Sequence, residues 1–516
     1  MPMRLSGLAT GMDTEALVGQ LMSAQSLKKK KLTGNKTKLE WKQEAWKDLN
    51  KKLTTLYNGS VSKLRLASTY NLKKASMSDS SKASVSASTN AVVGNYTMEV
   101  LDIASAQFLT SGKTSISGTS QKLSQLGLPA DAPEGALNDL VGEKITITGK
   151  NGTKELEITE GTTVNDFLKT ARDAGINASY DSGQKKFFLS SKETGEENAF
   201  TITDSKGGEA LAALGLGQVV KSEEDGKTVY KTVGGPEDQA LVEAKDSRIK
   251  LNGAILTSSS STVNANGLSI NLISKTKEDE PVSFSVSPDI DKVYEDIKKA
   301  LKEYNDVLKE MNTLYNASSA KGYEPLTSEE KRALSDDEVE EWEKKIKDSL
   351  LRRDSTLQGI SSAMRTSLQA SVTVNGHPYT LSSFGIMTST NYTEGGLLHI
   401  YGDPDDEVYS ARDDKLKKAL TENPDEAIKA LSDIFEGLRS TMFDKMRSTE
   451  YSSALTFYND KQMENDLKNY KSELKAWDDK MADMETAYYK KFAAMESAMA
   501  KLQSESSSVM GLFGIG

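Results

Sequence analysis

Apolar residues recur every seven positions near the C-terminal end of the chain, which is the spacing of a helix that packs along one face. The main series is Leu467, Leu474, Met481, Tyr488, Met495 and Leu502, and Tyr470, Trp477 and Met484 follow three residues after three of these. Glycine is absent from 438 to 510 and proline is absent after 424, so the pattern predicts one helix from about 440 to 503. At roughly 1.5 Å per residue, this helix would be about 95 Å long. No compact core is that wide, so much of this apolar face is expected to pack against another chain segment.

The N-terminal region carries a matching pattern. Leu32, Leu39, Trp46 and Leu53 recur at seven residues, and Leu49 and Leu56 fill a second series. Asp13 or Thr14 can cap the start, so a helix over 13–66 is predicted, about 80 Å long. Two long amphipathic helices at opposite chain ends predict an intramolecular pair, an oligomeric bundle, or both. These two sets of apolar residues are together called the seam.

Between the two ends, the chain reads as strands from about 72 to 290 and as helices with short strands from 289 to 438. The expected elements are a hairpin over 145–158, a short helix over 162–174, strands over 249–272, a helix along the stripe 293–308, a capping box at 335–338, a hairpin over 372–400 and a helix over 416–438 that Asn423-Pro424 interrupts.

The predicted fold class is therefore α+β and multidomain. Residues 1–70 and 440–516 are expected to form a terminal coiled-coil domain, and 71–105 with 289–439 a helical-plus-strand domain. Residues 106–288 are expected to form inserted β-rich domains, of which roughly 140–235 are the outermost.

Composition narrows the chemistry. The 516 residues include no Cys and only two His, and the formal charge is −10. A chain without Cys has no disulfide framework, thiol nucleophile or Cys-ligated metal, and its acidic balance argues against nucleic-acid binding. No apolar stretch approaches the roughly 18–20 residues of a membrane span, so no membrane insertion is expected. The first residues lack the apolar region of a secretory signal peptide.

Short motifs that resemble functional sites are incomplete. Gly112-Lys113-Thr114 matches the end of a phosphate-binding loop, but Gln107 replaces the required first glycine. A Gly215-Leu216-Gly217 turn lacks its third glycine, and the acidic run 403–407 lacks the spacing of a calcium loop. The histidines, His377 and His399, and the four lysines at 28–31 are interpreted as structural or solvated. We therefore predict no catalytic, cofactor-binding or metal-binding residue, no cofactor, and no enzyme.

Several segments together resemble the bacterial flagellar filament cap proteins, the FliD family (hook-associated protein 2). They are residues 5–13, 322–327, 341–343, 350–354, 381–386, 416–420 and Asn423-Pro424. Residues 163–167 and 175–180 are similar to a repeat shared by hook-associated proteins and flagellin insertions. The matches run in order along the chain to about 440 and continue through the terminal heptads.

The resemblance implies an extracellular cap at the distal tip of the flagellum, exported through the flagellar type III channel without a cleaved signal peptide. Such proteins form a homo-oligomeric ring, commonly a pentamer, whose terminal helices are legs on the filament end and whose other domains form a plate. The implied partners are flagellin at the filament tip and an export chaperone before secretion. In some species the plate also binds host mucin or glycans.

The expected function is thus capping: the ring promotes folding and insertion of exported flagellin, prevents its loss, and supports filament elongation and motility. Three alternatives remain open from the sequence: an adhesin that binds mucin or glycans through the central domains, a self-polymerising filament or junction protein, and a hydrolase hidden in the insertion.

Overall fold

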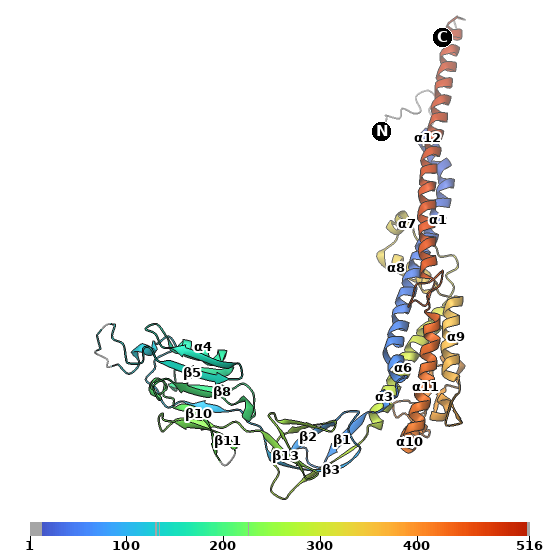
Figure 1. Cartoon of the computed structure of the whole chain (residues 1–516). Helices are drawn as coiled ribbons and strands as arrows, with labels where there is room; N and C mark the ends of the chain where they lie inside the picture. Colours follow the sequence, from blue (N-terminus) through green and yellow to red (C-terminus); the bar gives the residue numbers. More distant parts are fainter. Residues whose placement is uncertain (1–12, 129–131, 134, 225–226, 513–516) are drawn as a thin grey trace. The chain divides into compact units, whose positions relative to one another are not determined.

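The computed structural model describes residues 13–128, 132–133, 135–224 and 227–512 (Figure 1). The chain divides into two compact units. The first unit comprises Met1–Tyr70 and Ile290–Gly516, and the second comprises Asn71–Asp289.

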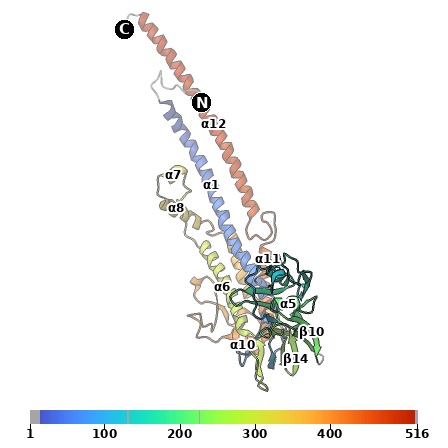
Figure 2. The same cartoon turned by 90° about the vertical axis from the view of Figure 1, so that its left-hand side faces the viewer.

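The first unit is built on two long helices from opposite ends of the chain, as the heptads predict. Helix α1 spans Thr14–Leu56 and α12 spans Asp460–Leu512, and they lie side by side in Figures 1 and 2. Asp13 caps α1, because its carboxylate accepts a hydrogen bond of 2.9 Å from the Ala16 amide. The chain then continues through a π-helical turn at Tyr57–Val61 into α2 (Ser62–Leu64) and α3 (Ala67–Tyr70).

The prediction of one helix from 440 to 503 was wrong at its start. Helix α11 ends at Lys445, and a loop precedes α12 at Asp460. In this loop Ser and Thr side chains bond to nearby backbone; for example, Thr449 Oγ1 accepts hydrogen bonds from the amides of Tyr451 and Ser452. Ser and Thr compete in this way with helical hydrogen bonds, so a segment without Gly or Pro can still leave the helix.

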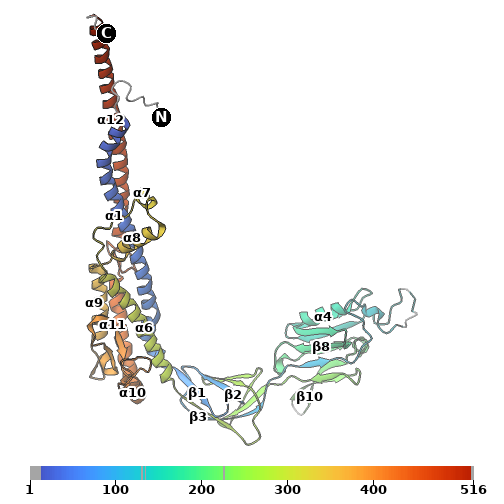
Figure 3. The same cartoon turned by 180° about the vertical axis from the view of Figure 1, so that it is seen from behind.

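The first unit contains further α-helices after residue 289, and all of them except the helix at 328–332 bury side chains. They are α6 (Ile290–Tyr315), α7 (Ser328–Arg332), α8 (Asp336–Asp348), α9 (Ser355–Gln369), α10 (Lys415–Glu422) and α11 (Pro424–Lys445). The predicted stripe of α6 is buried, and Ile297 and Leu308 are fully covered. Ser335 and Glu338 form the predicted capping box of α8. Figure 3 shows α6, α9 and α11 packed together beside α1.

The region predicted as a single hairpin over 372–400 forms two separate short hairpins instead. They are β18 (Val372–Val374) with β19 (His377–Tyr379), and β20 (Ile386–Thr388) with β21 (Leu398–Ile400). Asn375 and Gly376 have positive φ angles of 50° and 82°, the geometry of the predicted Asn-Gly turn.

The second unit contains two separate β-rich cores. One lies between a five-stranded and a three-stranded sheet and is filled by residues such as Met98, Ile249 and Phe284. Its strands are β1 (Lys73–Met77), β2 (Ala83–Ala87), β3 (Gly94–Asp102), β13 (Ser247–Leu251), β14 (Ala254–Ser258), β15 (Thr262–Ala265), β16 (Leu268–Leu272) and β17 (Val282–Pro288).

The other core contains Phe167, Phe187 and Phe200 and is enclosed by sheets β11-β10-β9-β5-β6 and β12-β4-β8-β7 with helices α4 (Val164–Asp173) and α5 (Glu209–Ala213). The strands are β4 (Phe108–Thr110), β5 (Lys144–Gly149), β6 (Gly152–Glu157), β7 (Ile176–Asp181), β8 (Lys186–Ser191), β9 (Thr201–Asp204), β10 (Gln218–Glu224), β11 (Lys227–Val233) and β12 (Ala240–Val242). The predicted hairpin over 145–158 and helix over 162–174 are confirmed.

The structure differs from the predicted domain boundary at 105/106. Residues 71–105 were expected to join 289–439, but their strands pair within the second unit: β1 with β17, β2 with β16, and β3 with β13 and β17. The reason is that these sheet partners lie 146 or more residues apart in the chain, and the periodicity of apolar residues does not indicate such distant pairing. Residues 71–105 thus belong with 106–289.

Candidate assembly interface

The seam is most deeply buried at the end of α1 nearest the helical core. Trp46, Leu49, Leu53 and Leu56 expose at most 2% of their surface. The Trp46 ring stacks on Tyr458 with centroids 5.6 Å apart, and the Asn50 side-chain oxygen accepts a 2.8 Å hydrogen bond from the Phe457 amide. These contacts fix the base of the helix pair.

Burial of the seam decreases toward the C-terminal end of α12. Leu467 is 9% exposed, whereas Met495 is 37% and Leu502 is 60% exposed. The residues of intermediate burial are Leu32, Leu39, Tyr470, Leu474, Trp477, Met481, Met484 and Tyr488. The structure therefore brings the inner seam together, and it leaves the outer residues of α12 as apolar surface without cover from the described chain.

Polar contacts connect the outer parts of the two helices. The Trp477 indole donates to the Gln25 carbonyl at 3.4 Å, and the Lys28 ammonium lies 4.7 Å from the centre of the Trp477 ring. Lys29 pairs with Asp478 at 2.5 Å. Lysines of the 28–31 run were expected to form a solvated face, and they remain largely exposed, but three of the four also make specific contacts. Such exposed pairs orient the helices more than they stabilise them.

The third of these lysines contacts a different element. Lys30 pairs with Glu330 of α7 at 2.5 Å, and this contact, together with the Thr327 capping hydrogen bonds, lowers the pKa of Glu330 to about 2. Further along α1, Lys38 pairs with Glu324 and Lys42 with Asp354, both by ion pairs shorter than 3 Å. One side of α1 is thus basic and is matched by acidic residues from 324–354.

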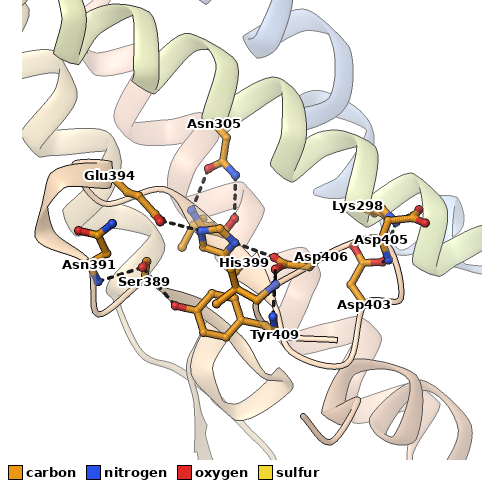
Figure 4. A network of polar contacts seen from close by, with 12 residues as sticks. Lys298, Asn305, Ser389, Asn391, Glu394, His399, Asp403, Asp405, Asp406 and Tyr409 are labelled. Carbon is orange, nitrogen blue, oxygen red and sulfur yellow. Dashed lines mark hydrogen bonds and ion pairs between the residues drawn. The ribbon is translucent and has the colours of Figure 1, made fainter. Parts of the chain in front are cut away.

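His399 lies in a network of polar contacts in the first unit (Figure 4). Its Nδ1 is 2.7 Å from Asp406 and its Nε2 is 3.0 Å from Glu394. Burial would raise the pKa of Asp406, but hydrogen bonds from His399 and from the Val408 and Tyr409 amides outweigh burial and hold it below its usual value. Both ring nitrogens are occupied by carboxylates, so the imidazole is positioned as a structural clamp rather than as a base facing a substrate.

The acidic run beside this network is held by a lysine. Asp403 and Asp405 both contact Lys298, at 2.7 and 2.5 Å. Burial would lower the pKa of Lys298, and these two carboxylates raise it above the ordinary value instead. Within the described parts of the chain, no cluster of three or more His, Asp or Glu has an arrangement that could hold a metal ion.

The incomplete phosphate-binding motifs serve packing. A Cβ at Gly112 would collide with Pro236 and Asp238, and the Lys113 amide donates to the Asp238 carboxylate, which would repel a phosphate. A Cβ at Gly217 would collide with the Gly234 carbonyl.

His377 is exposed on β19. In the described residues, no helix combines the length and apolar character needed to cross a bilayer.

Sequence reasoning missed the polar partners of the seam, namely Gln25, Asn50, Tyr458 and Asp478. Tyr458 and Asn50 lie outside the heptad series, so their contacts had no periodic signal. Residues 5–12 of the resemblance lie outside the described residues.

Two family profiles of known proteins match this chain. The family profile "Flagellar hook-associated protein 2 C-terminus" matches residues 244–504, and the corresponding N-terminus profile matches 10–107. The interval between them, 108–243, contains the second core of the Asn71–Asp289 unit.

Two relatives and one solved structure are similar to this chain. Flagellar hook-associated protein 2 of Halalkalibacterium halodurans is 28% identical over 472 residues, which cover 88% of this chain and 83% of the relative. The protein of the same name from Thermotoga maritima is 23% identical over 388 residues, or 70% and 54% of the two chains. The D1-D2-D3 domains of the flagellar cap protein FliD from Escherichia coli share the fold, with a TM-score of 0.50, 20% identity, and coverage of 78% and 96%.

Proposed function

The chain belongs to the flagellar hook-associated protein 2 family, and on that premise we propose that it caps the distal end of the bacterial flagellar filament. The cap retains exported flagellin at the tip and promotes its folding and insertion, so that the filament elongates and the cell swims. The protein acts by assembly and not by catalysis.

The observation that carries this proposal is the family match combined with the exposure gradient of the seam. The helix pair is anchored at its base by buried residues such as Trp46 and Leu49, and its far end presents apolar side chains such as Leu502. A contiguous apolar surface on a helix favours contact with another protein. The far end of α12 is therefore the part of the first unit best suited to contact the filament.

We further propose that copies of the chain form a closed ring, a pentamer, at the extracellular filament tip. Flagellin is the partner beneath the ring, and an export chaperone holds the chain before its passage through the flagellar channel. The absence of Cys suits a chain that crosses this channel unfolded, because cross-links would obstruct it. The family match favours this function over adhesion to mucin or glycans.

Deletion of the gene in its native bacterium tests the proposal. We expect short or absent filaments, loss of swimming, and a rise in unpolymerised flagellin in the medium. The full chain supplied from a plasmid should restore all three, whereas a chain truncated after residue 490, which removes the exposed end of α12, should not.

Filaments of normal length in the deletion strain would contradict capping. Long polymers formed by the purified chain alone would instead identify a self-polymerising filament or junction protein. Discrete rings, seen by light scattering and electron microscopy, agree with a cap.

A further inference from the structure

A pocket in the first unit is separate from the seam and shares only Glu394 with the His399 network. It has a volume of about 780 Å³ and lies among α6, α9 and the segment that precedes β21. Its lining includes Asn312 from α6, Ser362 and Arg365 from α9, and Tyr392 and Gly395 from the connecting segment. Tyr392 is 91% exposed, so the pocket has an aromatic side chain at its rim.

Arg365 is held in a defined orientation within this pocket. Its Nη2 donates to the Asn312 side-chain oxygen at 2.5 Å, and Asn312 in turn donates to the Gly395 carbonyl at 3.0 Å. The Nε atom is buried without a hydrogen-bond partner, and Gly396 lies against it, since a Cβ at this glycine would be 3.5 Å from Nε. The guanidinium is thus positioned by its neighbours before any ligand arrives.

The Nη1 end of Arg365 remains available. Among the described residues it has no hydrogen-bond partner, and it is not one of the buried atoms that lack one. No carboxylate of the described chain forms an ion pair with Arg365. Glu394 lines the same pocket, but its carboxylate is engaged by His399 at 3.0 Å (Figure 4).

Arg365 thus has no ion-pair partner among the described residues, and the lining carries two cations, Arg365 and Lys309, against the single carboxylate of Glu394. An Nη1 that donates to a carboxylate forms a charge-assisted hydrogen bond, which is stronger than one between neutral groups. A fixed guanidinium also loses little conformational entropy on binding.

We propose that the Arg365 pocket receives a carboxylate side chain from a neighbouring copy of this chain in the ring. This inference rests on the proposed ring. The charge balance supports a second copy as the source, since the chain has 75 acidic and 65 basic residues and offers an excess of carboxylates. A closed ring also requires contacts between two different surfaces of the same subunit, which an arginine pocket and an acidic residue elsewhere would provide.

The first test measures ring dissociation by light scattering for three variants of the full chain. Arg365→Gln should raise the dissociation constant at least about tenfold, as expected when one partner of an enclosed charged pair is removed. Ser362→Glu should weaken the ring similarly, because it places a carboxylate in the pocket from within the same chain and leaves Asn312 and Arg365 intact. Thr366→Glu, an exposed α9 position outside the pocket, is the matched control and should leave the ring unchanged.

The second test identifies the partner. In Arg365→Lys, a carbodiimide joins the new amine directly to any carboxylate in contact with it. Rings mixed from ¹⁴N- and ¹⁵N-labelled chains distinguish links between copies from links within one copy by mass spectrometry. A link from position 365 to an Asp or Glu of another copy supports the proposal.

Other outcomes overturn it. A ring unaffected by Arg365→Gln, a loss with Arg365→Gln but not with Ser362→Glu, or links only within one chain or only to added flagellin would each refute the inter-copy contact. These results leave the ring itself intact. An unsubstituted chain that remains monomeric at all concentrations would refute the proposed ring and this contact together, so the two failures are distinguishable.

Discussion

At the scale of single residues, the contacts that matter are specific rather than merely hydrophobic. Trp46 and Asn50 each bind a defined partner in the loop that precedes α12, and Arg365 and His399 are each held by named neighbours. The same scale explains why apparent motifs carry no chemistry, because their glycines are required by close packing.

The Lys30–Glu330 contact can be tested through its effect on acidity. The pKa of Glu330 is lowered from 4.5 to about 2, first by Lys30 and then by Thr327. Lys30→Ala should therefore raise the Glu330 pKa toward its ordinary value, as measured by NMR titration. Lys31→Ala, which removes the adjacent exposed lysine, is the matched control and should leave it unchanged.

The sign of the associated pH effect follows from the lowered pKa. A carboxylate that is more acidic in the folded state stabilises it above the unfolded pKa, and this contribution is lost as the pH falls through the folded value. The contact of α7 with α1 should thus be fully present above about pH 4.5 and weaken progressively toward pH 2. Stronger docking of α7 at pH 3 than at pH 7 would contradict this assignment.

Gly217 provides a second test at this scale. A Cβ there would collide with the backbone carbonyl of Gly234, so Gly217→Ala should destabilise the second unit by about 1–3 kcal/mol. Gly161→Ala is the control, since no atom lies within 4 Å of its added Cβ. Thermal unfolding followed by circular dichroism measures both. Equal stability of the two variants would remove the packing explanation of the Gly215-Leu216-Gly217 turn.

At the scale of elements, substitutions in the inner seam should reduce stability far more than substitutions in the outer seam. Leu49 is fully buried, so Leu49→Ala should cost about 2–5 kcal/mol in unfolding free energy. Leu502 is 60% exposed, so Leu502→Ser should change stability by less than about 0.5 kcal/mol. Denaturant unfolding provides the comparison.

The same two variants separate stability from function. If the outer seam contacts the filament, Leu502→Ser should shorten filaments in the complemented deletion strain despite a stable fold. Normal filament length together with unchanged stability would argue against a role for this end of α12.

At the scale of the whole molecule, the structure divides the chain at 70/71 and 289/290. Every strand of β1 to β17 pairs within this interval, so a fragment of residues 71–289 should fold by itself. A fragment of 106–288 lacks β1, β2 and β3, which removes partners of β13, β16 and β17.

The two fragments can be compared by circular dichroism and two-dimensional NMR. The longer fragment should show the dispersed spectrum of a folded protein throughout. The shorter one should retain the core containing Phe167 and Phe187 but show poorly dispersed signals from 245–288. Full folding of both would mean that β1 to β3 are dispensable for the sheet.

The sequence by itself determined the helical ends, their caps and the local hairpins. Heptad spacing, Asp13, the box at Ser335 and the Asn375-Gly376 turn act within a few residues, so their signal is complete in the local pattern. The family resemblance could also be recognised from the sequence alone, because it rests on short motifs that occur in order along the chain.

Only the tertiary structure decided what depends on contacts between distant segments. The pairing of β1 with β17, the burial gradient of the seam and the Arg365 pocket join residues that are far apart in the chain. The break before α12 was missed for a related reason, because its Ser and Thr hydrogen bonds compete with a helix that the apolar pattern permits equally well. Periodicity reports which face of an element is buried, whereas the partner that buries it is chosen by the fold.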